Sequence, residues 1–130
     1  MIDRLNPINS TSSLVALSAA AAATYTSDDQ LNENSKGVRV FFDVTTATAA
    51  SVVLTIQAKD PVSGKYVDLL SSAAVTSTGT TAYTVYPGVT VASNVALSAP
   101  LGRTWRVKVV VSDNAGTAAV TGTVGATLCA

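Results

Sequence analysis

Residues 37–45, GVRVFFDVT, decide the fold class of this chain, because apolar and polar side chains alternate along them. One face of this segment carries four large apolar residues, Val38, Val40, Phe42 and Val44. Alternation with a period of two is typical of a half-buried β-strand, whose successive side chains point to opposite faces. Phe41 interrupts the polar face, so we expect that face also to meet protein.

Residues 103–111, RTWRVKVVV, repeat the pattern. Trp105 shares a face with Val107, Val109 and Val111, which predicts that the indole anchors a core. Further strands are predicted at residues 14–25, 52–58, 66–70, 73–78, 81–86 and 117–128. We therefore expect an all-β fold, a single antiparallel β-sandwich of about eight strands. The sequence leaves an immunoglobulin-like and a jelly-roll-like sandwich equally open.

Glycine and proline place the turns. In KDPVSGKY (residues 59–66), Asp60 and Pro61 begin a turn and Gly64 supplies a positive φ, so a hairpin is predicted. The strands at 73–78 and 81–86 are expected to join near Gly79. Residues 27–36 and 89–100 are predicted loops, and in the second Asn94 is expected to brace its own backbone. In the last strand, Gly122 and Gly125 indicate a bulge or close packing.

The first 13 residues are polar and aperiodic, and we interpret them as an extended N-terminal arm in front of a sandwich domain of residues 14–130. Docking of this arm on its own domain or on a neighbouring subunit remains open. The apolar run at 14–23 resembles the core of a signal peptide, but Asp3 and Asn6 precede it and alanine dominates it. It is also far too short to span a bilayer. We therefore expect a strand there.

Composition excludes several classes of partner. Eight basic and eight acidic residues give the 130-residue chain no net charge, so no basic surplus is available to neutralise a nucleic acid. Only 12% of the residues are charged and 48% are hydrophobic, which predicts that neighbouring protein covers part of the surface. Cys129 is the only cysteine, so an intrachain disulfide is impossible and assembly in a reducing cytoplasm is favoured.

Residues for catalysis are scarce. The chain has no histidine, which removes the commonest general base and a leading zinc ligand. Neither a phosphate-binding loop nor a zinc-ligand spacing is present. Asp28, Asp29 and Glu33 lack the register of a calcium loop, so they are interpreted as a solvated loop. We expect no enzymatic activity, catalytic residue, metal or cofactor.

Two arginines flank Trp105, and they are expected to form surface pairs with aspartates or to lie in an interface, where arginine is favoured. Together with apolar and basic residues of the arm, they complete the candidate interface set. Its members are Ile2, Arg4, Leu5, Pro7, Arg103 and Arg106.

Four features resemble a known group of proteins: KDPVSGKY (59–66), VYPGVT (85–90), Asn94 and PLGRTWRV (100–107). Over residues 37–127 the chain is similar to small all-β virion structural proteins of tailed bacteriophages. The resemblance implies a capsid decoration or stabilisation protein, seated on the major capsid protein or another virion protein. It also implies a symmetric array or self-association, no membrane partner, and a place in a virion assembled in the host cytoplasm.

Two alternatives to a decoration protein are open. The first is a tail or fibre module for host attachment, which would use the loop at 89–100. The second is a surface carbohydrate-binding module with the same sandwich fold.

Overall fold

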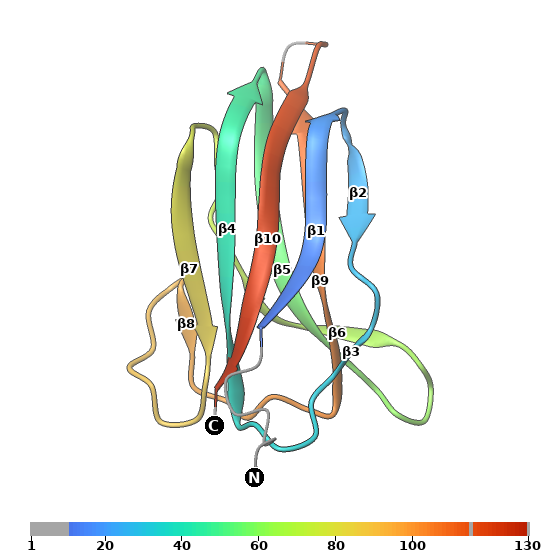
Figure 1. Cartoon of the computed structure of the whole chain (residues 1–130), viewed down its shortest axis with the longest axis vertical. Coiled ribbons are helices and arrows are strands. Elements are labelled where there is room, and N and C mark those ends of the chain that lie inside the picture. Colours follow the sequence, from blue (N-terminus) through green and yellow to red (C-terminus); the bar gives the residue numbers. More distant parts are fainter. Residues whose placement is uncertain (1–10, 115, 130) are drawn as a thin grey trace, which may run out of the picture.

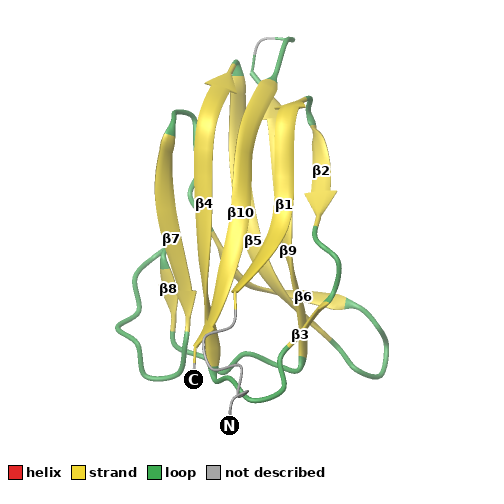
Figure 2. Cartoon of the chain, in the orientation of Figure 1, coloured by secondary structure: helices red, strands yellow, loops and turns green. Residues whose placement is uncertain are grey.

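The computed structural model describes residues 11–114 and 116–129, and every regular element in these two ranges is a β-strand (Figure 2). The expected all-β fold is therefore confirmed. The strands are β1 (Thr11–Ala20), β2 (Ala23–Thr26), β3 (Gln30–Leu31), β4 (Gly37–Thr48), β5 (Ala50–Lys59), β6 (Tyr66–Ser71), β7 (Gly79–Val85), β8 (Ala96–Leu97), β9 (Thr104–Asp113) and β10 (Ala119–Cys129).

The strands form two sheets that pack face to face. In Figure 1, β1, β10, β4 and β7 lie in front of β5 and β9. The front sheet has the order β1-β10-β4-β7-β8, and the back sheet has the order β2-β9-β5-β6, with β3 paired to β9. Neighbouring strands are antiparallel except β7 and β8, which are parallel. The predicted antiparallel sandwich is thus confirmed.

The strand order decides which kind of sandwich this is. The last strand, β10, lies between β1 and β4 and not beside β9. In an immunoglobulin-like sandwich the last two strands are neighbours in one sheet. Without the two-residue strands, the orders β1-β10-β4-β7 and β2-β9-β5-β6 are those of an eight-stranded jelly roll. The described chain therefore has jelly-roll topology.

The core lies between the sheets and is built from every second residue of the long strands. Val38, Val40, Phe42 and Val44 of β4 are at most 2% exposed, and Trp105 of β9 is 1% exposed. The prediction of Trp105 as a core anchor is confirmed. Full burial of a valine or phenylalanine side chain stabilises the fold by about 1.5–3 kcal/mol. The alternating pattern of the sequence is therefore the inward and outward alternation of the two sheets.

The segment 14–25 was predicted as one strand, and this prediction is wrong. β1 pairs with β10 in the front sheet, whereas β2 pairs with β9 in the back sheet. The chain crosses between the sheets around residues 21–22, shortly after Ala19 adopts a φ of 46°. Alanine side chains are small enough to permit this crossing and carry no pattern that would mark it. Residues 11–13 belong to β1, and the rest of the predicted arm lies outside the described residues.

The predicted strand at 73–78 is also absent. Only Val75 pairs with β5, through two backbone hydrogen bonds with Val52 of 2.8 and 2.9 Å. The segment then leaves the back sheet and leads to β7 in the front sheet. Val75 pairs with β5 of the back sheet, whereas β7 belongs to the front sheet, so the two predicted strands do not pair with each other.

The long loop at 89–100 contains a short strand that the sequence did not predict. β8 extends the front sheet beside β7, where the amide of Thr84 donates to the carbonyl of Val95 at 2.9 Å. Asn94 has a φ of 62°, and its side-chain amide donates to the carbonyl of Ser71 at 2.9 Å. Asn94 therefore braces the loop against the end of β6, not against its own backbone as predicted.

The predicted close packing of the last strand is confirmed at Gly122. A β-bulge interrupts the β10–β4 register between Thr121 and Gly122. A Cβ atom on Gly122 would lie 2.3 Å from the backbone carbonyl oxygen of Asp43. Only glycine permits the backbones of β10 and β4 to approach this closely.

Gly122→Ala is expected to lower the free energy of unfolding by about 1–3 kcal/mol, because β10 must move away from β4 to accommodate the methyl group. Urea unfolding followed by the fluorescence of Trp105, the only tryptophan, measures the change. Gly102→Ala is the matched control, because a Cβ there meets nothing within 4 Å. Equal stability of the two variants would contradict this role for Gly122.

Candidate interaction surfaces

A cluster of polar side chains covers the outer face of the back sheet. The register of β5 with its two neighbours places Gln57 between Arg106 of β9 and Asp68 of β6. Lys59 of β5 lies opposite Tyr66 of β6 in the same way. These side chains point away from the core, because the residues between them, such as Trp105 and Ile56, point into it.

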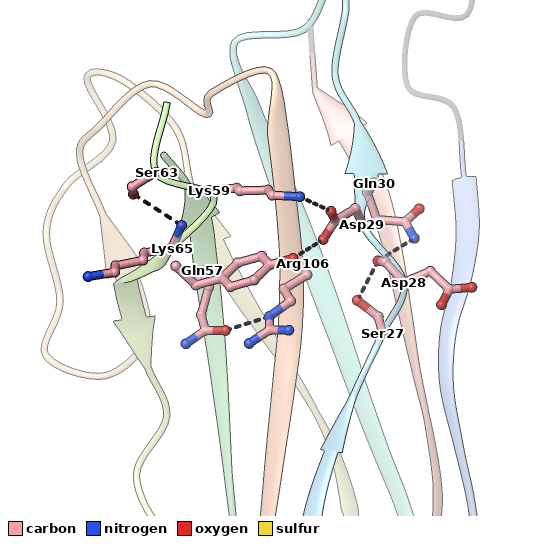
Figure 3. Close-up of polar contacts among 10 residues, drawn as sticks. Ser27, Asp28, Asp29, Gln30, Gln57, Lys59, Ser63, Lys65 and Arg106 are labelled. Carbon is pink, nitrogen blue, oxygen red and sulfur yellow. Dashed lines mark hydrogen bonds and ion pairs between the residues drawn. The ribbon is translucent and has the colours of Figure 1, made fainter. Parts of the chain in front are cut away.

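Hydrogen bonds link this polar cluster across three strands. Arg106 Nε donates to Gln57 Oε1 at 2.8 Å (Figure 3). Gln57 Nε2 donates in turn to Asp68 Oδ1 at 2.8 Å. The Arg106 guanidinium also lies 3.5 Å from the centroid of the Tyr66 ring. Such a stacked cation contributes about 0.5–2 kcal/mol. Gln57 is only 5% exposed although its side chain points outward, because its neighbours cover it.

Asp29 connects this cluster to the loop that precedes β3. Lys59 Nζ donates to Asp29 Oδ2 at 2.8 Å, and the Tyr66 hydroxyl donates to Asp29 Oδ1 at 2.5 Å. The Lys59 bond first, and then the Tyr66 bond, hold the pKa of the Asp29 carboxyl below its ordinary value of 3.8. The same carboxylate raises the pKa of Lys59 above 10.5. Asp29 thereby ties the loop to the hairpin of β5 and β6.

Asn32 is a structural residue that the sequence analysis missed. It is 6% exposed, and its side-chain amide donates to the carbonyls of Ser35 at 2.8 Å and Leu101 at 3.2 Å. Its side-chain oxygen accepts from the amide of Ser35 at 2.9 Å. The run Asn32-Glu33-Asn34-Ser35 is a signal for such a turn, because asparagine often bonds to nearby backbone. Asn32 fixes the loop beside the start of β9.

The six candidate interface residues fall into three groups. Ile2, Arg4, Leu5 and Pro7 lie outside the described residues. Arg103 is exposed, and its guanidinium is 4.0 Å from the Glu33 carboxylate, a surface pair that contributes at most about 1 kcal/mol. Arg106 binds Gln57 and Tyr66. Among the described residues, Arg103 therefore pairs with a glutamate and Arg106 with a glutamine and a tyrosine ring, and the role of both arginines in an interface stays a prediction.

The acidic loop offers no arrangement for a metal ion. Within the described residues, no three histidine, cysteine, aspartate or glutamate side chains lie close enough together to hold one. The Asp29 carboxylate is bound by Lys59 and Tyr66. Cys129 is half-buried, and its thiol lies 3.7 Å from the carbonyl of Thr127. In the described part of the chain, no helix is long and apolar enough to cross a membrane.

Most aromatic rings are used in packing. Trp105 and Tyr83 are at most 3% exposed, and the Arg106 guanidinium covers the Tyr66 ring. Phe41 is different, because 39% of it is exposed on the outer face of the front sheet. Among the residues that the structure describes, it is the most exposed aromatic residue. The front sheet therefore exposes an aromatic ring, whereas the large apolar residues exposed on the back sheet, Leu31 and Val67, are aliphatic.

Comparison with known proteins identifies no family. No protein-family model matches the chain, and no curated protein matches it. Among solved structures, it is similar to a chain in the structure of the infectious bursal disease virus Gx strain, with a TM-score of 0.42 and 15% sequence identity. The similarity covers 92% of this chain and 30% of that chain, so this chain spans less than a third of its length. A likeness this low carries no argument about function.

The Asp29 contacts predict a loss of stability in acid. Because the pKa of Asp29 is lower in the folded than in the unfolded chain, its bonds stabilise the fold fully above about pH 4. This contribution is lost as the pH falls through the folded-state pKa. Asp29→Asn should remove this part of the pH dependence, measured as urea midpoints between roughly pH 2 and pH 6.

Asp28→Asn is the matched control, because it neutralises the adjacent carboxylate and leaves both bonds of Asp29 in place. This variant should keep the acid-side loss of the wild type. The same loss in Asp29→Asn would show that other carboxylates produce it.

Proposed function

We propose that this chain is a non-enzymatic structural protein of a virus particle, specifically a capsid decoration or stabilisation protein seated on the major capsid protein shell. The observation that carries the proposal is the strand order β1-β10-β4-β7 against β2-β9-β5-β6. Jelly rolls of this kind recur in viral capsid and lectin domains. This support is an analogy of fold, to which the sequence resemblance to small virion proteins of tailed bacteriophages adds the particle location.

Two features of the chain support a role without catalysis. The sequence has no histidine, and the described acidic side chains form no group of three. The polar side chains that do converge, such as Arg106, Gln57 and Asp68, bind one another. These bonds connect three strands of the back sheet, and an internally bonded sheet suits a structural component of a shell.

A lectin-like function has less support than a particle function. Sugar-binding sites commonly offer exposed aromatic rings for stacking on the sugar, but Trp105 and Tyr83 are buried and Arg106 already lies over Tyr66. The exposed ring of Phe41 lies beside Gly125 and Ala82 on the face of a sheet, whereas ligand sites are concave. A tail or fibre module remains the second candidate, because the loop between β7 and β8 exposes Val91 by 63% and Val95 by 45%. Apolar side chains exposed at a loop tip suit contact with another surface.

Labelling of intact particles tests the particle location. An antibody against this chain should decorate the whole head in electron micrographs of particles purified from the source host. Quantitative mass spectrometry of the same particles should give a fixed ratio of this chain to the major capsid protein. Label confined to the tail would replace decoration by the tail module, and particles without the chain would overturn the proposal.

Deletion of residues 2–10 tests the predicted docking arm. This deletion ends before β1, which begins at Thr11 and pairs with β10 through Thr127. We expect the thermal midpoint to stay within a few degrees of the wild type, while occupancy on particles that lack the native protein falls severalfold. Full occupancy by the shortened chain would show that the arm does not seat the protein.

A further inference from the structure

Around the exposed ring of Phe41, the outer face of the front sheet carries small side chains and few charges. Phe41 of β4 lies opposite Gly125 of β10 on one side and Ala82 of β7 on the other. On the next strand, Ser13 of β1 lies opposite Gly125. Small side chains therefore surround Phe41 in its row across the sheet, which leaves the ring 39% exposed. Among the described residues of this row, no large side chain stands between the ring and a second flat surface.

Two charges lie on this sheet, and both flank Phe41 on the same strand. Among the described residues of β1, β10, β4, β7 and β8, only Arg39 and Asp43 are charged. Each lies two residues from Phe41, which puts all three on one face at intervals of about 7 Å. The Arg39 guanidinium lies 5.7 Å from the centroid of the Phe41 ring, and Asp43 Oδ1 accepts from the Thr80 hydroxyl at 2.9 Å. Positive charge, ring and negative charge thus form a line along β4.

This line is complementary to itself. Consider two copies whose front sheets face each other, related by a two-fold axis that lies between these front sheets and runs perpendicular to β4. Arg39 of each copy then lies over Asp43 of the other. The two Phe41 rings then meet at the axis. The small residues Gly125 and Ala82 leave room beside each ring, so that the two rings can stack with an offset. A two-fold axis parallel to β4 would place like charges over each other. The charges therefore select one orientation.

We propose that the outer face of β4 is a self-association surface, on which two copies of this chain form a symmetric dimer through Phe41, Arg39 and Asp43. Two-fold contacts of this kind use the same patch on both partners, as this face does. The two ion pairs between Arg39 and Asp43 set the orientation of the dimer, and the apolar centre at Phe41 excludes water from between the two facing front sheets. The contact would form in solution whether or not the chain belongs to a virus particle.

Sedimentation of the full chain over a wide concentration range tests the dimer. We expect a concentration-dependent dimer in the wild type. Arg39→Asp and Asp43→Arg should each raise its Kd by about tenfold or more, because each places like charges together at both ends of the contact. Phe41→Ser should also weaken it. Lys108→Asp is the control, because it makes the same change of charge on β9 in the other sheet.

The charge variants also test the orientation. An equal mixture of Arg39→Asp and Asp43→Arg chains should regain a heterodimer, because every facing pair is again of opposite charge. The double variant Arg39→Asp/Asp43→Arg should regain the homodimer for the same reason. A monomer at every concentration, a dimer insensitive to both single changes, or no recovery in the mixture would each overturn the proposal. Trp105 fluorescence verifies that each variant is folded.

Discussion

The alternate apolar residues of β4, β5, β9 and β10 must all be removed from water, and this requirement organises the molecule. Val38, Val40, Val107 and Val109 are fully buried, and Trp105 fills the space between the sheets at one end. In a single sheet, the face that carries these apolar side chains would be exposed to water. Two packed sheets satisfy all of them together, because strand alternation turns the other side chains outward.

The close approach of β10 to β4 follows from the same requirement. β10 has to lie in the middle of the front sheet so that Val120 and Val124 reach the core. Its bulge at Gly122 brings the two backbones into contact at Asp43. With β10 between β1 and β4, the first and last strands are neighbours, and the chain must pass repeatedly from one sheet to the other. That is the jelly-roll topology.

The two outer faces of the sandwich differ in character. On the back sheet, Arg106, Gln57 and Asp68 bind one another, and Asp29 ties the neighbouring loop to Lys59. Side-chain atoms on that face are largely satisfied within the chain. On the front sheet, Phe41 lies among small residues with one charge on each side. The outer face of the front sheet is therefore better suited to contact with another protein, because few internal bonds have to be broken to cover it.

The sequence by itself determined the strands that form the core. Val38–Val44 and Trp105–Val111 alternate so regularly that their fold class and inward faces were predictable, and Gly64 and Gly122 were interpreted correctly from local chemistry. The prominence of Phe41 was visible in the same way. Each of these properties depends on residues that are close together in the sequence, so the alternation of apolar and polar residues is enough to predict it.

Only the tertiary structure decided how the strands connect. Residues 14–25 divide between two sheets, 73–78 cross between them, and Asn94 binds Ser71, although nothing in their local pattern indicates this. Arg106 likewise finds Tyr66 and Gln57 because β9, β5 and β6 are neighbours. Periodicity specifies which side of a strand is buried, but not which strand lies beside it. That choice depends on closing one core from all the strands at once, and so it appears only in the folded chain.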